Sequence, residues 1–215
     1  MSESSFGLFG GIESAVRKFA KSRYRIGLYL LIFMLGTVVG TPGPGYAKEE
    51  VGPGVGQPAS TNGVSIYVGK LSKTLTLSQN GKEIGTYPVS IGSKSLEGDK
   101  EIEGDLRTPS GEFYVCTRND KSICYLALGL SYPSISDAER GYEQGLITET
   151  ERDEIIRANN AGEQPPWNTA LGGAIEIHGE RNPNGSTQGC VAVDNDVMDI
   201  LWQYCNLGVP VTIGP

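Results

Sequence analysis

The sequence predicts a mainly β domain with a helical insert, and three observations lead to this fold class. Apolar residues alternate with other residues over 64–68 and again over 75–77, which is the period of a half-buried strand. Between such runs, Asn80-Gly81 is a strong signal for a two-residue hairpin turn. Helical signals are confined to an insert and to one stretch near the C-terminus. Many short strands with few helices indicate one β-rich domain.

Further strands are expected on both sides of the insert. The alternation continues beyond the hairpin to Ile91, and a short strand is predicted over 111–115. After the insert, the apolar stretch 174–177 runs directly into His178, and a strand over 209–213 closes the sheet.

Three helix starts are marked by capping residues. Ser136-x-x-Glu139 and Thr148-x-x-Glu151 both match the capping box, and the second opens a helix over 149–158. This polar insert can be a lid or a solvated edge, and its composition favours the solvated edge. The last helix is predicted over 196–204, with its N-cap at Asp194 or Asn195 and its stop at Gly208.

Residues 1–47 predict an export signal or a membrane anchor. A basic cluster up to Arg25 precedes an uncharged, largely apolar run over 26–39, and a Gly- and Pro-rich stretch then ends at Ala47. This order is typical of a secretory signal, and the run is shorter than the roughly 20 residues of a spanning helix. We expect cleavage near Ala47, with an uncleaved inner-membrane anchor over 26–41 as the alternative. The protein is then exported, to the periplasm or the cell envelope.

The rest of the chain reads as a linker and one acidic domain. Residues 48–62 are rich in Gly, Pro, Ser and Thr and predict a flexible linker, which leaves 63–215 as the folded domain. The net charge is -7, and residues 1–47 hold five basic and two acidic side chains, so the remainder carries -10. Nucleic acid is therefore excluded as a partner, because its binding depends on Lys and Arg contacts to phosphate.

The cysteine and histidine content limits the chemistry. The chain has a single histidine and four cysteines without a CxxC pair, so we expect no metal site and no cofactor. In an exported protein the cysteines can form disulfides. Cys116 and Cys124 are close enough in sequence for a local loop. A pairing of Cys190 with Cys205 is the main alternative to a reactive Cys190.

His178 and Cys190 are the candidates for a reactive pair. His178 ends a strand, and a loop rich in Asn, Gly, Pro and Ser leads from it to Gly189-Cys190. A strand end holds a base rigidly, and a glycine next to the thiol lets the chain turn and expose it. A nearby imidazolium lowers the pKa of a thiol from about 8.5 and so raises the thiolate population. The alternative is a histidine that only ends its strand.

Two motifs resemble the L,D-transpeptidase (YkuD-type) family. The stretch 177–195 (IHGERNPNGSTQGCVAVDN) resembles the family's active-site signature, which reads H-G, a loop, S/T-x-G-C, an aliphatic residue and then Asp or Asn. The stretch 104–113 (GDLRTPSGEF) resembles its G-D-x-x-T-P-x-G-x-F segment. The resemblance covers about 64–213, nearly the whole predicted domain.

The resemblance implies roles for these residues. It implies a β-rich catalytic domain with Cys190 as the acyl-accepting nucleophile and His178 as base and acid. The carbonyl of Gly179 is expected to orient His178. The backbone N–H groups of Gly189 and Cys190 are expected to stabilise the oxyanion, with each donor contributing roughly 3 kcal/mol.

One departure concerns substrate binding. Many family members have Arg two residues after the nucleophile, and here that residue is Ala192. Arg107, Arg181 and Thr187 are the candidates for substrate contact in its place.

The function implied by the resemblance is cross-linking of peptidoglycan. Cys190 would form a thioester with a stem tetrapeptide and pass the acyl group to an amine, and carbapenem-type inhibitors would acylate the same thiol. The alternatives are an L,D-carboxypeptidase or endopeptidase, in which water takes the acyl group, and a non-catalytic wall-binding domain that keeps the fold.

Overall fold

The computed structural model describes residues 61–215, which fold around one mixed eight-stranded sheet with the order β3-β2-β1-β8-β4-β5-β6-β7. The strands are β1 (Val64–Gly69), β2 (Thr74–Gln79), β3 (Lys82–Pro88), β4 (Gly111–Ser122), β5 (Tyr125–Leu130), β6 (Glu176–His178), β7 (Val191–Ala192) and β8 (Pro210–Gly214). The pairs β1–β8 and β6–β7 are parallel, and the other neighbours are antiparallel.

The predicted segment 1–47 and nearly all of the predicted linker over 48–62 lie outside the described residues. Within the described part of the chain, none of the helices is both long and apolar enough to cross a membrane.

The sheet curls until its two ends meet. The first residues of β4 pair with β8 and its later residues pair with β5, so β4 turns the sheet over on itself. At the far end, the amide of Ser90 donates to the carbonyl of Ala192 at 2.9 Å, and the amide of Ala192 donates back at 2.8 Å. Strand β7 is therefore held by β6 on one side and by the segment after β3 on the other.

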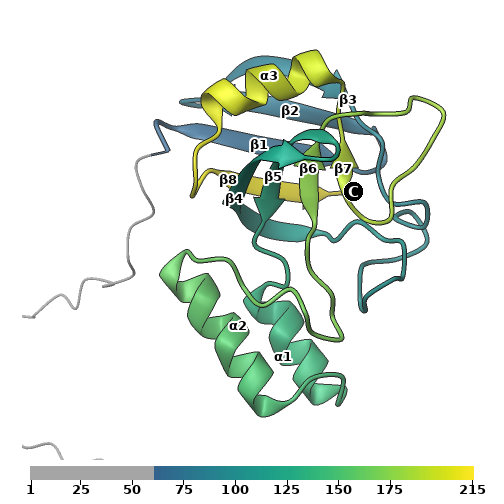
Figure 1. Ribbon diagram of the computed structural model, residues 1–215, viewed down its shortest axis with the longest axis vertical. Coiled ribbons are helices and arrows are strands. Elements are labelled where there is room, and N and C mark those ends of the chain that lie inside the picture. Colours follow the sequence, from purple (N-terminus) through teal and green to yellow (C-terminus); the bar gives the residue numbers. More distant parts are fainter. Residues whose placement is uncertain (1–60) are drawn as a thin grey trace, which may run out of the picture. The chain divides into compact units, whose positions relative to one another are not determined.

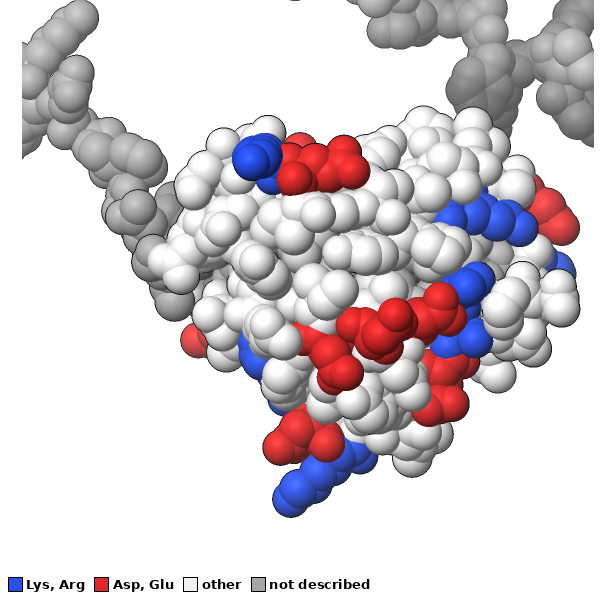
Figure 2. Space-filling model, turned by 90° about the horizontal axis from the view of Figure 1, so that it is seen from above, with Lys and Arg blue, Asp and Glu red and all other residues white. Residues whose placement is uncertain are grey.

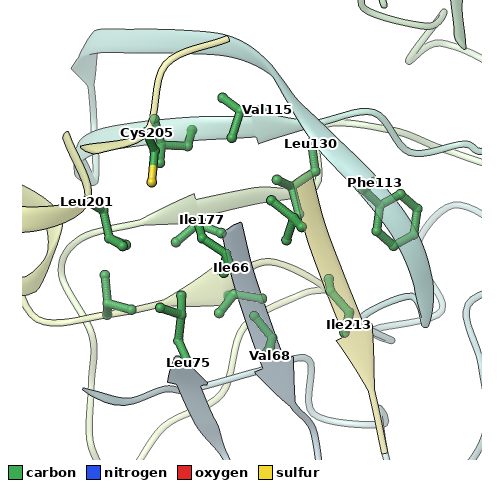
Figure 3. Close-up of a cluster of buried hydrophobic side chains, with 14 of the residues drawn as sticks. Ile66, Val68, Leu75, Phe113, Val115, Leu130, Ile177, Leu201, Cys205 and Ile213 are labelled. Carbon is green, nitrogen blue, oxygen red and sulfur yellow. The ribbon is translucent and has the colours of Figure 1, made fainter. Parts of the chain in front are cut away.

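The predicted hairpin is confirmed, and so is the alternation in β1 and β2, whereas no residue of β3 is buried. Asn80 and Gly81 have φ values of 52° and 75°, as a primed two-residue turn requires. The inward residues of the strands form one core with α3 (Asn195–Tyr204). Figure 3 shows part of this core, with side chains from several strands close to Leu201 of α3 and to the buried thiol of Cys205.

The insert is a helix pair with a small core of its own. α1 (Ile135–Glu143) and α2 (Glu149–Ala161) lie at one end of the domain, and α3 lies at the other (Figure 1). Four residues of this insert region form a second buried cluster: Ala138, Ile147, Ile155 and Leu171.

The helix caps are confirmed in part. The Thr148–Glu151 capping box is present, but the N-cap of α1 lies two residues earlier than predicted, with Ser134 as N-cap and Asp137 as its partner. The prediction of Ser136–Glu139 was wrong because the Asp137 carboxylate accepts from the Ser134 amide at 3.0 Å. An aspartate thus occupies the N3 position of this capping box, where the usual pattern has Glu or Gln.

The C-terminal helix follows its predicted bounds, and the state of the cysteines decides between the alternatives that the sequence left open. Asp194, one of the two predicted N-caps, is the N-cap of α3, although its side chain makes no capping hydrogen bond. The helix ends at Tyr204 as predicted, with Cys205 as its C-cap. All four cysteines are free thiols. Neither the Cys190–Cys205 pairing nor the Cys116–Cys124 pairing is formed.

The acidic excess of the sequence is visible on the surface. In the view of Figure 2, which is the upper side of Figure 1, Asp and Glu side chains form a row across the face with Lys and Arg beside it. Most charged groups lie on the outside of the domain, as their hydration requires, and Lys70 and Lys100 are buried exceptions.

Candidate active site

Strands β6 and β7 bring His178 and Cys190 to one place. The two strands pair in parallel, with Ile177 opposite Val191 and His178 opposite Ala192. Cys190 immediately precedes β7, so it lies beside the end of β6 although twelve positions separate the two residues in sequence. Both side chains line a single cavity of about 540 Å³. The structure therefore assembles the pair that the sequence motifs single out.

A backbone carbonyl fixes the tautomer of His178. The Nδ1 atom lies 2.7 Å from the carbonyl oxygen of Gly179. A carbonyl oxygen can only accept, so Nδ1 carries the hydrogen and Nε2 is left with its lone pair. Gly179 thus makes the hydrogen bond that we expected to orient the imidazole of His178. Nε2 is the nitrogen that can take a proton from a thiol.

Asn195 holds the turn that carries this carbonyl. Its Oδ1 accepts from the Glu180 amide at 2.8 Å, and its Nδ2 donates to the Glu180 carboxylate at 2.9 Å. The same Oδ1 atom lies 2.5 Å from where a Cβ on Gly179 would stand, so only glycine fits there. Asn195 belongs to the signature-like stretch, but sequence reasoning gave it no role beyond a possible helix cap.

Thr187 organises the loop that carries the nucleophile. Its hydroxyl donates to the Cys190 carbonyl at 2.6 Å and accepts from the Gly189 amide at 3.1 Å. Its own amide donates to the Ile91 carbonyl at 2.9 Å. Thr187 lines the cavity, as a substrate-contacting residue must, yet its hydroxyl is already used to shape the loop.

The oxyanion donors differ from the expectation. The Gly189 N–H already donates to the Thr187 hydroxyl. Of the two expected donors, the Cys190 N–H therefore remains as the candidate that can bind the oxyanion. No hydrogen bond from this amide is formed within residues 61–215. Gly189 is needed for another reason. Its φ is +147°, and a Cβ there would stand 2.9 Å from the carbonyl oxygen of Arg107.

Burial keeps the Cys190 thiol protonated at rest. Desolvation raises the pKa of Cys190 to about 11, and the negative charge of Glu176 acts in the same direction. The thiol lies 3.5 Å from the carbonyl oxygen of Ala174. A thiolate is therefore formed by proton transfer to a base when the thiol attacks, and a stable population of resting thiolate is not expected.

The two candidate arginines do not line the cavity. Arg107 donates from Nη1 to the Asp99 carbonyl at 2.9 Å. Arg181 forms a two-pronged ion pair with Asp194, at 3.0 Å and 2.9 Å. Each guanidinium is directed to a partner that was not apparent in the sequence, and substrate contact by these two residues stays a prediction.

Comparisons with known proteins identify the family of the domain. A family model described as "L,D-transpeptidase catalytic domain" (YkuD) matches residues 64–213. A search of curated proteins finds no match.

Solved structures with a similar fold include Bd1075 of Bdellovibrio bacteriovorus, at 23% identity over 71% of this chain and 48% of that chain, with a TM-score of 0.47. The helical cell shape determining protein Pgp2 of Campylobacter jejuni matches at 21% identity over 74% and 50%, with a TM-score of 0.48. The L,D-transpeptidase LdtMt1 in complex with imipenem matches at 14% over 71% and 59%, with a TM-score of 0.41. The chain thus spans about half the length of the first two.

Proposed function

The chain belongs to the L,D-transpeptidase catalytic domain (YkuD) family, and from this premise we propose that it is a cysteine L,D-transpeptidase acting on peptidoglycan stem peptides. The observation that carries the proposal is the placement of Cys190 and His178 on paired strands, lining one cavity, with Nδ1 of His178 held by the Gly179 carbonyl. A wall-binding domain without chemistry would have no need of this fixed tautomer.

In the first half-reaction, Sγ of Cys190 attacks the carbonyl carbon that precedes the terminal D-amino acid of a tetrapeptide. Nε2 of His178 takes the thiol proton as the C–S bond forms, and the carbonyl oxygen becomes an oxyanion facing the Cys190 amide. The C–N bond then breaks, and the imidazolium gives its proton to the leaving amine. A thioester on Cys190 and a free D-amino acid result.

In the second half-reaction, an amine of another stem attacks the thioester. His178 takes the amine proton, a new amide forms, and the thiol of Cys190 is regenerated. Attack by water in place of the amine would make the same site an L,D-carboxypeptidase or endopeptidase. The two outcomes share every step up to the thioester and differ only in what reaches the cavity.

We propose in addition that this chemistry takes place outside the cytoplasm, in the periplasm or cell envelope. The support is the basic, apolar and small-residue order of residues 1–47, and the substrate class is found in that compartment.

The test is intact-protein mass spectrometry of the full chain before and after incubation with a carbapenem, a strained acyl donor for the thiol. We expect a single adduct in the wild type and none in Cys190→Ala. Cys116→Ala is the matched control, because Cys116 is a partly buried thiol outside the cavity and its removal should keep the adduct. A wild type that forms no adduct, or an adduct that survives Cys190→Ala, would overturn the assignment of the nucleophile.

Release of the terminal D-amino acid from a tetrapeptide, with and without an amine acceptor, then separates the two fates of the thioester. A cross-linked product supports the transpeptidase, and a tripeptide acid as the sole product supports the hydrolase.

A further inference from the structure

Glu176 carries a half-buried carboxylate that the proposed mechanism does not use. It is the first residue of β6, and the next residue, Ile177, is fully buried in the core. Successive side chains of a strand point to opposite faces, so Glu176 and His178 share the outer face, with Cα atoms about 7 Å apart. Glu176 does not line the reactive cavity. Its carboxylate is therefore a neighbour of the base that does not meet the substrate.

The pairing of β6 with β7 also places Glu176 beside the nucleophile. His178 pairs with Ala192 in the parallel register of the two strands. Two residues earlier on each side, the same register sets Glu176 opposite Cys190. Neighbouring strands lie about 5 Å apart, and residues opposite one another point to the same face. The carboxylate thus has the thiol on the adjoining segment and the imidazole along its own strand.

The rest of the surroundings of Glu176 gives its charge no partner. Gly129 of β5 is opposite Glu176, and a Cβ on Gly129 would stand 2.8 Å from the ring of Trp167, so an indole covers this face. The Cys116 thiol donates to the Gly129 carbonyl at 3.4 Å and is the ionisable group on the β4 side. Within residues 61–215, the Glu176 carboxylate accepts no hydrogen bond and forms no ion pair.

Partial burial strengthens the electrostatic effect of this carboxylate. Desolvation raises the pKa of Glu176, and the charge of His178 opposes that shift. The negative charge also contributes to the raised pKa of Cys116, which burial brings to about 12. Charges that are partly removed from water interact more strongly than exposed ones. A single uncompensated charge is therefore felt by the groups that surround it.

This charge acts on the two reactive groups in opposite directions. After burial, the charge of Glu176 is a further cause of the raised pKa of Cys190, so it opposes a free thiolate. The attraction between the carboxylate and a protonated imidazole is mutual, so it favours a proton on His178. During attack the negative charge moves from sulfur to the carbonyl oxygen, whereas the positive charge stays on His178. The repulsion thus weakens while the attraction is kept.

We propose that Glu176 is a positioning residue of the reaction centre, whose carboxylate keeps the proton on the Cys190 thiol at rest and stabilises the imidazolium of His178 during attack. The inference rests on the proposed function, which it deepens by adding a third ionisable residue to the pair. Glu176 takes part in no bond and in no proton transfer, and it acts only through its charge.

The test is Glu176→Gln in the full chain, which removes the charge and nearly keeps the shape. Two rates are measured at pH 8. Alkylation of Cys190 by iodoacetamide, a neutral reagent, needs only the thiolate, and we expect it to rise about fivefold because the pKa of the thiol falls. Acylation by a carbapenem needs His178 as base and acid. We expect it to fall about twentyfold, a small part of what acid–base catalysis contributes.

The opposite signs separate a charge effect from a structural one, because a disturbed loop would expose or misplace the thiol in both reactions. Peptide mapping assigns the alkylation to Cys190, and the denaturation midpoint shows that each variant is folded. Glu176→Asp keeps the charge, and both of its rates should lie between those of the wild type and of Glu176→Gln. Glu112→Gln removes a charge from an exposed residue outside the cavity and should leave both rates unchanged.

Two rates that change in the same direction in Glu176→Gln, or that do not change, would overturn the role of Glu176 alone, since the wild-type adduct at Cys190 would still support the proposed function. A wild type that forms no carbapenem adduct at Cys190 would overturn the proposed function, and the role of Glu176 with it.

Discussion

Two regions of the domain are held in place by different forces. One is the sheet edge with the reactive residues His178 and Cys190, and the other is the helical insert. Around the nucleophile, directional hydrogen bonds predominate: Thr187 bonds the amide before Cys190 and the carbonyl of Cys190, and Ala192 is bonded to Ser90. The insert depends on a small apolar cluster and two capping boxes. Hydrogen bonds fix direction, whereas apolar burial is non-directional and follows area.

This difference separates chemistry from stability. A substitution at the sheet edge should change the rate of acylation more than the free energy of unfolding. A substitution in the insert should do the reverse, because none of the residues of α1 and α2 lines the reactive cavity.

The largest expected effect concerns the thiol itself. Burial raises the pKa of Cys190 to about 11, so the thiolate is about 10⁻⁴ of the population at pH 7. Alkylation of Cys190 by iodoacetamide should therefore accelerate about tenfold per pH unit, roughly a thousandfold between pH 7 and pH 10. Peptide mapping by mass spectrometry at each pH measures it. A plateau already reached below pH 8 would contradict this and indicate a stable thiolate–imidazolium pair.

Gly189→Ala should be the most damaging small substitution at the sheet edge. Its φ of +147° and the Arg107 carbonyl oxygen 2.9 Å from the new Cβ force the loop to move. Displacement of a reacting atom by about 1 Å costs on the order of a hundredfold, and we expect the rate of carbapenem acylation to fall by at least that factor.

The matched control is Gly145→Ala in the insert. Gly145 also has a positive φ, +70°, but nothing lies within 4 Å of its new Cβ. The Gly145→Ala variant should have a slightly lower free energy of unfolding and an unchanged acylation rate. Equal loss of rate in the two variants would show that backbone strain at any glycine impairs the enzyme.

Ile155→Ala tests the insert side of the comparison. Ile155 is fully buried in the small cluster of the insert, so its truncation should lower the free energy of unfolding by about 3 kcal/mol. Chemical denaturation measures that change. Acylation per folded molecule should stay at the wild-type rate, and a lower rate would reveal that the insert is coupled to the cavity.

The sequence predicted the parts of the fold that have local patterns. Strands with one buried face and the Asn80-Gly81 turn were found, because alternation and turn residues are local signals. Strand β5 was missed, and its last four residues, Ala127–Leu130, are all buried, so no alternation is visible there. The extension of β4 to Ser122 was missed for a related reason, since its later residues are polar and only the pairing with β5 makes them a strand.

In the site, too, only residues that belong to a local sequence pattern could be predicted. Cys190, His178 and Gly179 were singled out because their motif is contiguous, and the parallel pairing of β6 with β7 brings them together. Substrate contact by Arg107 and Arg181 stays a prediction, because the partner of a long side chain depends on tertiary contacts, as the ion pair of Arg181 with Asp194 illustrates. The Gly189 amide was assigned as a free donor because a sequence does not show that Thr187 accepts from it.

The smallest change in acylation rate is expected for a substitution at Asn195. This substitution also separates the positioning of His178 from the stability of the fold most sharply. Its side chain holds Glu180 through two hydrogen bonds, and Glu180 follows the Gly179 carbonyl that fixes His178. Asn195→Ala should let this turn relax and reduce the acylation rate about tenfold, because the imidazole is then less often in the productive orientation.

Thr148→Ala is the control, because it removes the capping hydroxyl of α2 and should cost about 1 kcal/mol of stability. The acylation rate and the denaturation midpoint are measured for both variants. If the Asn195 variant loses rate while the Thr148 variant loses only stability, the bonds around His178 are required for its orientation. If both lose stability alone, the Gly179 carbonyl stays in place without Asn195, and the backbone of β6 is sufficient to orient His178.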